Sequence, residues 1–187
     1  MNGLPADYFA SPLPARVYDY WLDGKDNYDV DRRAADELTR ECPGLRVMAR
    51  ENRRFVLDAT GWLARNRGIR QFLDLGCGLP ARPSVHQAAR EVIPGAAVVY
   101  VDRDPVAVVN VAALEARGDG LAVLAADVRD AGAVLGAGEV REVIDLSQPA
   151  GVILGGTLSD MSPSDARRPV QAYMHALGLT QCMLTVV

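Results

Sequence analysis

The feature that most constrains the fold is residues 71–80, QFLDLGCGLP, in which a short apolar run ends in an acid and then opens into a turn with two glycines. The apolar run is the kind expected of a strand that is covered on both faces. Gly76 and Gly78 allow the backbone to turn sharply and to approach a ligand closely. A helix is expected to follow from about residue 82 to residue 92. The stretch therefore predicts the first strand and the ligand loop of a nucleotide-type α/β fold.

Asp74, just before the turn, indicates which ligand the loop favours. Two glycines alone are a weak signal, because the dinucleotide fingerprint has a third glycine where this chain has Ala81. A carboxylate at this point would repel a pyrophosphate, whereas it would attract an ammonium or a sulfonium group. S-adenosylmethionine carries both of these cations, so Asp74 favours that cofactor. The alternative is that Asp74 only caps a turn.

A second strand, predicted over residues 97–102, also ends in an acid, Asp102. Asp102 follows Gly78 by 24 residues, close to the spacing at which nucleotide-binding domains place a carboxylate on the two ribose hydroxyls. The other interpretation of Asp102 is a helix N-cap. Asp104 fits that role better, because it directly precedes the helix expected over residues 105–117. We therefore interpret Asp102 as a ribose ligand.

The third predicted strand, residues 121–126, is followed by Asp127 and Val128. The Asp127 carboxylate would accept a hydrogen bond from an exocyclic amine, and the N–H of Val128 would donate to a ring nitrogen, which together would recognise adenine. Asp74, Asp102 and Asp127 would then line the carboxyl edge of one parallel sheet, where ligands bind. The agreement of three strand ends is far more specific than any one acid.

The second half of the chain predicts two more strands and two helices. The strands are expected over residues 150–154 and 180–187, and a short helix over residues 131–135 precedes a connection over residues 136–149. Ser164 or Asp165 would begin the last helix, which runs to about residue 177, although Pro169 shifts the expected beginning to Arg168. A final apolar strand exposes a sheet edge, which proteins usually cover. This edge is a candidate surface for oligomer formation.

The region before the sheet divides into a flexible terminus, residues 1–14, and a helical extension, residues 15–66, ahead of the sheet domain, residues 67–187. Residues 15–32 are dense in aromatic and charged side chains around Gly24. One interpretation is a helix pair that docks on the core through Tyr18, Trp21 and Leu22. The other is a lid over the ligand, whose aromatic faces and carboxylates suit a sulfonium. In the lid interpretation, a ligand carboxylate would be held by Arg16 or Lys25.

Two helices are expected within the extension, over residues 31–41 and 45–66. In the second, an apolar stripe is predicted to pack against the sheet; it consists of Leu45, Met48, Phe55 and Trp62. The arginines of the same helix are interpreted as its solvated face; they are Arg46, Arg50, Arg53 and Arg54.

Composition excludes several classes of protein. The chain has 187 residues, 49% of them hydrophobic and 24% charged, and a net charge of −4, which disfavours a polyanionic nucleic-acid partner. Three scattered cysteines, Cys42, Cys77 and Cys182, and two histidines, His86 and His175, predict neither a metal site nor a disulfide framework. No signal peptide and no run of roughly 18 apolar residues is present, so we expect a cytoplasmic protein without a membrane span.

Four stretches together resemble a known family. They are residues 15–28 (ARVYDYWLDGKDNY), 68–80 (GIRQFLDLGCGLP), 85–86 (VH) and 99–105 (VYVDRDP). They resemble the actinobacterial family of S-adenosylmethionine-dependent methyltransferases that was formerly a domain of unknown function. The resemblance covers roughly residues 15–165, and members are longer by about two strands.

The resemblance implies a seven-stranded Rossmann-like fold, here a doubly wound, mostly parallel sheet with an N-terminal helical extension and without its last strands. It implies that residues 16–27 fold over the cofactor. It also implies a set of cofactor-binding positions, namely Asp74, Gly76, Gly78, Asp102, Asp127 and Val128. Family members carry an apolar stretch with a histidine or aromatic residue after the fourth strand, where this chain has residues 155–160, GGTLSD.

The residues and the resemblance both favour a methyltransferase that uses S-adenosyl-L-methionine and acts on a small-molecule acceptor. Methyl transfer is an in-line displacement with a neutral leaving group, so it needs alignment and exclusion of water more than it needs a metal. If the acceptor is a hydroxyl, the candidate bases are His86 and Asp19. Two alternatives stay open, an NAD-dependent oxidoreductase and a non-catalytic module that binds an adenosyl ligand.

Overall fold

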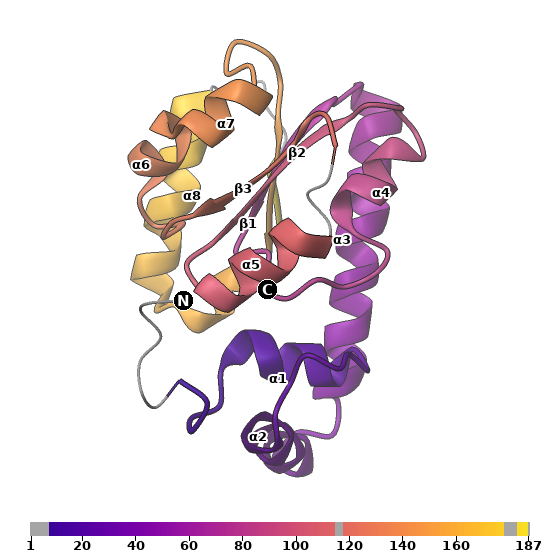
Figure 1. Cartoon of the computed structure of the whole chain (residues 1–187), viewed down its shortest axis with the longest axis vertical. Coiled ribbons are helices and arrows are strands. Elements are labelled where there is room, and N and C mark those ends of the chain that lie inside the picture. Colours follow the sequence, from indigo (N-terminus) through magenta and orange to yellow (C-terminus); the bar gives the residue numbers. More distant parts are fainter. Residues whose placement is uncertain (1–7, 115–117, 178–182, 187) are drawn as a thin grey trace.

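The computed structural model describes residues 8–114, 118–177 and 183–186. Its centre is a five-stranded parallel sheet with the order β3-β2-β1-β4-β5 (Figure 1). The strands are β1 (Gln71–Leu75), β2 (Ala97–Asp102), β3 (Leu121–Ala125), β4 (Gly151–Gly155) and β5 (Met183–Val186). With β1 at the centre and crossovers to both sides, this order confirms the predicted Rossmann-like α/β fold. The predicted strand residues 180–182 and 187, Cys182 among them, lie outside the described residues.

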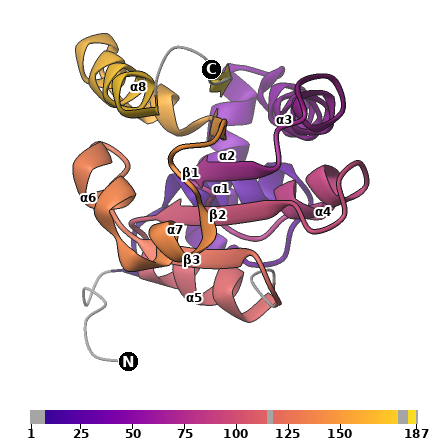
Figure 2. The same ribbon diagram turned by 90° about the horizontal axis from the view of Figure 1, so that it is seen from above.

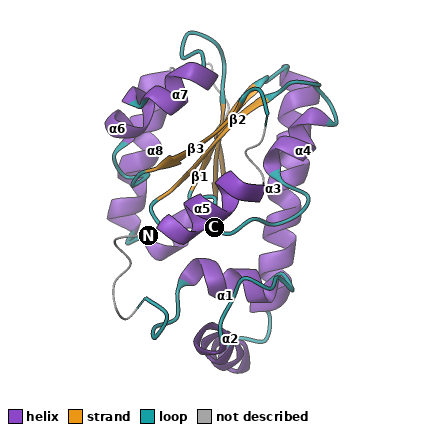
Figure 3. Ribbon diagram, viewed as in Figure 1, coloured by secondary structure: helices purple, strands orange, loops and turns teal. Residues whose placement is uncertain are grey.

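Helices cover both faces of the sheet (Figures 2 and 3). In chain order they are α1 (Pro14–Trp21), α2 (Asp29–Glu41), α3 (Leu45–Arg67), α4 (Val85–Arg90), α5 (Pro105–Leu114), α6 (Ala131–Gly136), α7 (Gly138–Val143) and α8 (Pro163–Leu177), with a 3-10 helix at Thr157–Asp160. The first core cluster joins α6, α7 and α8 to the sheet, and the second joins α3, α4 and α5. Within the described ranges no helix is long and apolar enough to cross a membrane.

Alternation along the strands decides which side chains meet which helices. Leu73 and Leu75 belong to the cluster with α6, α7 and α8, whereas Phe72 belongs to the cluster with α3, α4 and α5. Asp74 therefore faces α3, α4 and α5 as well. On β2 the same alternation puts Asp102 on that face, because Tyr100 belongs to the second cluster. Two of the three predicted acids thus lie on one side of the sheet.

Of the predicted extension, α1 and α2 lie beyond the carboxyl ends of the strands, at the bottom of Figure 1, whereas α3 packs on the sheet. Arg16 of α1 is 1% exposed, and its Nε lies 3.1 Å from the carboxylate of Asp31 in α2. Asp31 also accepts hydrogen bonds from the N–H groups of Leu13 and Tyr28, at 3.0 and 2.9 Å. These contacts lie at the beginnings of both helices, so Asp31 fixes how α1 and α2 pack together.

The apolar stripe predicted to pack α3 against the sheet is wrong. Met48, Phe55 and Trp62 are 58%, 48% and 49% exposed. The buried face consists instead of Ala49, Val56, Thr60, Leu63 and Ala64. The face that packs on the sheet thus combines Val56 and Leu63 with small residues, and Met48 and the two aromatic residues lie outside it.

Two predictions for the second half are also wrong. The connection over residues 136–149 contains a helix, α7, and α8 begins at Pro163 rather than at Arg168. Ser162 caps α8, because its hydroxyl accepts a hydrogen bond from the N–H of Asp165 at 3.2 Å. The first turn is therefore fixed ahead of Pro169, which lies buried inside the helix.

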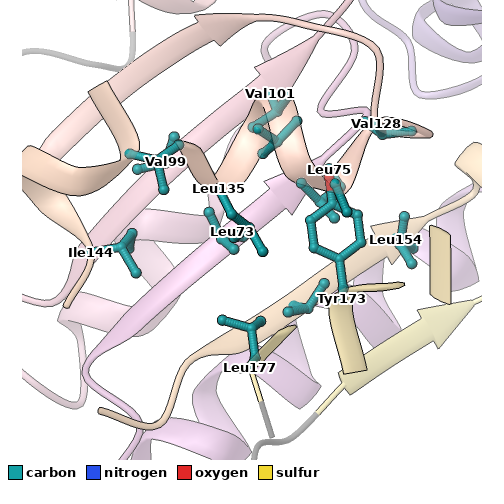
Figure 4. Close-up of a cluster of buried hydrophobic side chains, with 14 of the residues drawn as sticks. Leu73, Leu75, Val99, Val101, Val128, Leu135, Ile144, Leu154, Tyr173 and Leu177 are labelled. Carbon is teal, nitrogen blue, oxygen red and sulfur yellow. The ribbon is translucent and has the colours of Figure 1, made fainter. Parts of the chain in front are cut away.

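Tyr173 of α8 places a polar hydroxyl group inside the apolar core (Figure 4). Its side chain is fully buried against residues such as Leu75 and Leu154, and burial raises the pKa of its hydroxyl. Within the described part of the chain, that hydroxyl has no hydrogen-bond partner. A buried polar group without a partner costs stability.

We expect Tyr173→Phe to stabilise the protein by about 1–2 kcal/mol, because it removes an unsatisfied buried hydroxyl and keeps the ring. The matched control is Tyr100→Phe, since the Tyr100 hydroxyl is also buried but bonds to His86 at 2.8 and 3.1 Å. That control should destabilise by about 1 kcal/mol. Urea unfolding measures both, and a loss of stability in Tyr173→Phe would contradict the assignment.

Candidate active site

The turn after β1 is built on two glycines in the left-handed region. Gly76 has φ +73° and Gly78 has φ +62°. The N–H of Gly76 donates to the carbonyl of Val101 at 2.7 Å, which fixes the turn on the end of β2. A Cβ at Gly76 would lie 2.0 Å from Oγ1 of Thr157, whose hydroxyl donates to the carbonyl of Leu75 at 2.9 Å. The loop after β4 thus closes over the turn, and Gly76 must stay without a side chain.

Asp102 ties this glycine turn to the next loop. One carboxylate oxygen accepts from the N–H of Gly78 and the other from the N–H of Asp104, both at 2.8 Å. Asp104 in turn accepts from the N–H of Val106 at 2.9 Å. Asp104 is therefore the cap of α5, as predicted, and Asp102 is the link between the two loops. A carboxylate oxygen accepts more than one hydrogen bond, so both oxygens keep capacity for a ligand.

Asp74 is the most unusual group at this edge. It is 6% exposed, and none of the described residues donates a hydrogen bond to it. Burial raises the pKa of its carboxyl to about 6, the guanidinium of Arg53 acts in the opposite direction, and the nearby Asp102 adds to the rise. A buried carboxylate that only one nearby cation stabilises is typical of a site that binds a positively charged ligand.

Arg53 is a site residue that the sequence analysis missed. Its guanidinium donates to the carbonyl of Ala81 at 2.8 Å and also to that of Pro83, so it braces the loop between β1 and α4. Sequence analysis placed it on a solvated helix face. Its partners are backbone carbonyls, which leave no signal in the sequence. Arg46 and Arg50 likewise pair with Asp23 rather than with water alone.

The beginning of the N-terminal extension lies beside the glycine turn, an arrangement that fits both the lid and the docked helix pair. A Cβ at Gly78 would lie 3.8 Å from the Cβ of Ala15 in α1. The Tyr8 hydroxyl donates to the carboxylate of Asp104 at 2.7 Å, and the Tyr18 hydroxyl donates to the carbonyl of Ala49 at 2.9 Å. The extension is therefore joined to the loop after β2 and to α3.

The polar residues of α1 that were predicted to act on the ligand make hydrogen bonds and an ion pair within the N-terminal segment. Nε of Arg16 lies 3.1 Å from the Asp31 carboxylate and Nη2 donates to the carbonyl of Ser11 at 2.6 Å, whereas Nη1 is buried without a hydrogen-bond partner among the described residues. The role of Arg16 in holding a ligand carboxylate stays a prediction. Asp19 accepts from the N–H of Asp26 at 2.9 Å and from the Asn27 amide at 2.8 Å. It organises the turn between α1 and α2, and its role as a base stays a prediction. The side chain of Lys25, the other predicted carboxylate ligand, is exposed.

Asp127 and Val128 follow β3 at the same edge of the sheet but do not join Asp74 and Asp102. The Asp127 carboxylate bonds to Arg129, which lowers its pKa to about 2. Val128 is 6% exposed and packs in the core cluster with α6, α7 and α8. The structure thus brings two of the three acids together and leaves the third paired with an arginine.

His86 lies on the flank of the site, in the first turn of α4. Its Nδ1 is 2.8 Å from the hydroxyl of Tyr100 and 3.0 Å from that of Ser84. Tyr100 pairs in register with Asp74, so His86 lies behind the site on the face of α3 and α4. Among the residues that the structure describes, no group of metal-ligating side chains is large enough to hold an ion.

The family model for S-adenosyl methyltransferases matches residues 8–185 of this chain. The chain belongs to the S-adenosyl methyltransferase family. Two solved structures are similar over nearly its whole length. A Thermobifida fusca YX protein assigned as a methyltransferase shares 43% identity with a TM-score of 0.91, covering 97% of this chain and 68% of that one. A DUF574 family protein from Streptomyces avermitilis MA-4680 shares 35% identity with a TM-score of 0.90, covering 95% and 69%.

Membership in this family agrees with the resemblance seen in the sequence. The chain is an S-adenosylmethionine-dependent methyltransferase, and its cofactor is S-adenosylmethionine. The family assignment favours this function over the NAD-dependent oxidoreductase. No curated protein matches the chain.

The pKa of Asp74 predicts how stability depends on pH. Unfolded, this carboxyl ionises near 3.8, whereas in the folded methyltransferase its pKa is about 6. Between these values the folded chain keeps a proton that the unfolded chain has lost, so the free energy of unfolding falls as pH rises. We expect Asp74→Asn to be more stable than wild type by about 2–3 kcal/mol at pH 7, with the difference gone below about pH 4.

Urea unfolding at several pH values measures this difference. The control is Asp58→Asn, whose carboxylate lies on the exposed side of α3 with 72% of its side chain accessible. Its profile should follow that of wild type. Parallel profiles for wild type and Asp74→Asn would show that Asp74 does not hold the raised pKa.

Proposed function

We propose that this methyltransferase holds S-adenosylmethionine on the turn after β1, with Asp74 as the counter-charge of its cationic end. The observation that carries the proposal is the buried Asp74 carboxylate, which lacks a hydrogen-bond donor within the described residues and has a raised pKa. An ammonium or sulfonium beside it would supply the missing compensation. A phosphorylated ligand would increase the repulsion instead.

The residues around Asp74 fit the rest of the cofactor. Gly76 and Gly78 bring bare backbone to the strand end, and Asp102 is anchored at both oxygens with acceptor capacity left for ribose hydroxyls. Asp127 and Val128 stay the proposed adenine contacts. Recognition of adenine by Asp127 would have to compete with its present partner, Arg129.

When bound, the cofactor supplies an electrophilic methyl group on a positively charged sulfur. The chain's own contribution is alignment and exclusion of water. α1 lies beside Gly78, and Tyr8, ahead of α1, donates a hydrogen bond to Asp104, so the N-terminal segment covers one side of the turn. We assign no catalytic base among the described residues, and a neutral amine or a thioether acceptor would need none, because its lone pair can attack the methyl group directly.

We further propose a small-molecule acceptor and a cytoplasmic location. The net charge of −4 does not favour a nucleic-acid acceptor. Cys42 and Cys77 are both free thiols, which agrees with a reducing compartment. The edge strand β5 pairs with β4, and oligomer formation through the sheet edge stays a prediction.

Calorimetry with S-adenosylmethionine and with S-adenosylhomocysteine tests the assignment of the site. We expect Asp74→Asn to weaken both ligands by about tenfold to a hundredfold, because each loses a charge-assisted hydrogen bond to a buried carboxylate. Asp58→Asn, on the exposed side of α3, should bind like wild type. Unchanged affinity in Asp74→Asn would remove Asp74 from the site, and preferential binding of NAD would overturn the proposal.

The same carboxylate sets the pH dependence of binding. Asp74 has a pKa of about 6 in the free protein, so it is protonated, and unable to pair with a cation, at lower pH. We expect the affinity for S-adenosylhomocysteine to fall as the pH drops from 7 to about 5, and Asp74→Asn to lose this dependence. Calorimetry at fixed ionic strength measures it. A wild-type affinity that stays constant across this range would contradict the role of Asp74.

A further inference from the structure

Asn52 occupies a position at the cofactor edge that sequence analysis did not single out. It lies on α3 four residues before Val56, whose Cγ2 would be 2.9 Å from a Cβ at Gly155, the last residue of β4. Four residues are about one helical turn. α3 ends just before β1 begins, so its earlier turns lie toward the carboxyl edge of the sheet. Asn52 therefore projects past the end of β4.

The hydrogen bonds of Asn52 fix the orientation of its amide. Nδ2 donates to the Tyr18 hydroxyl at 3.1 Å and to the carbonyl of Gly155 at 3.3 Å. The Gly155 carbonyl can only accept, and the Tyr18 hydroxyl already donates its proton to Ala49 at 2.9 Å. Both neighbours therefore require the amide nitrogen, and its two hydrogens are used.

The oxygen of the same amide has no hydrogen-bond donor in the part of the chain that the structure describes. Oδ1 of Asn52 is buried and has no hydrogen-bond partner within the described residues. Such buried acceptors are rare and costly, and each calls for an explanation. Asp74 is likewise a buried acceptor without a donor from the described chain, and it faces α3 from β1. This side of the site is rich in acceptors and poor in donors.

Arg53, the next residue of α3, also has a polar atom that is unsatisfied by the residues described. Nε of Arg53 is buried without a hydrogen-bond partner among the described residues, although its terminal nitrogen braces the loop after the glycine turn. Two consecutive residues of α3 thus carry an acceptor and a cationic donor that are unmatched within the described part of the chain. An α-amino acid carries the complementary pair, an ammonium and a carboxylate.

We propose that Oδ1 of Asn52 accepts a hydrogen bond from the ammonium group of the cofactor's methionyl end. This assignment rests on the proposed function of the site and adds a residue from α3 to it. Because Asn52 also holds Tyr18 of α1, the residue that recognises the ammonium is bonded to the lid. Asn52 is therefore a specificity residue for adenosyl ligands that keep their amino-acid end.

Three ligands separate this role from a purely structural one. S-adenosylhomocysteine carries the ammonium and the carboxylate, its decarboxylated analogue keeps only the amine, and 5′-methylthioadenosine lacks both. Calorimetry on Asn52→Leu should show about a tenfold to hundredfold loss for the first two ligands. The affinity for 5′-methylthioadenosine should stay within about twofold of wild type, because that ligand has no group to lose.

Two further variants serve as controls. Tyr18→Phe removes the hydroxyl that joins Asn52 to the lid but leaves Oδ1 in place, so its ratio of S-adenosylhomocysteine to 5′-methylthioadenosine affinity should match wild type. Asn66→Leu changes an exposed asparagine on the same helix, bonded only to the carbonyl of Trp62 at 3.0 Å, and should bind all three ligands normally. Thermal melts confirm that each variant is folded.

The outcomes distinguish this inference from the proposed function. If wild type binds none of the three ligands, the proposed function fails. If wild type binds them but Asn52→Leu weakens all three equally, Asn52 is only a structural latch and the inference is overturned. It is also overturned if only S-adenosylhomocysteine is weakened, which would assign Asn52 to the carboxylate, or if Tyr18→Phe changes the ratio as Asn52→Leu does.

Discussion

The burial of the Asp74 carboxylate is the constraint on which the rest of the site depends. All five residues of β1 are buried, so the acid sits in a strand that otherwise excludes water. Taking a carboxylate out of water is costly unless a cation or several donors compensate for it. Arg53 offsets part of that cost from α3, while Asp102 adds to it from β2. A fold optimised only for stability would place an apolar residue here, and the retained charge indicates a ligand.

The walls of the site come from segments that are distant in the sequence, and few polar bonds connect them. Asp102 holds the glycine turn, Arg53 holds the loop that follows it, and Thr157 closes over it from the far side. Each of these bonds ends on a backbone atom of the loop. The loop has little secondary structure of its own, so its shape is imposed by side chains of β2, α3 and the loop after β4.

This dependence explains how much could be predicted from the sequence. The strands were predictable because each is a continuous apolar run bounded by an acid or a glycine. The two glycines predicted the turn after β1, and Asp74 predicted a cationic ligand there. Arg53 and Asn52 could not be found, because their partners are mainly backbone carbonyls whose positions exist only in the folded chain.

The errors have equally physical causes. In α3 the buried face combines Val56 and Leu63 with small residues such as Ala49 and Ala64, so the prediction made from the largest apolar side chains chose the wrong face. In α8 the cap at Ser162 outweighed the proline that was taken to set the beginning.

The buried charges of α1 and α2 pair with each other. Arg16 and Asp31 are both almost completely buried, and the guanidinium also lies over the rings of Tyr8 and Tyr28, at 5.0 and 5.1 Å from their centroids. A buried ion pair adds little net stability, but it penalises every packing of α1 on α2 that separates the charges. The extension is therefore held together by its own polar network and joined to the site by a few hydrogen bonds, those of Tyr8 and Tyr18 among them. A segment assembled in this way would need little ordering when a ligand binds beside it, because its internal geometry is already fixed.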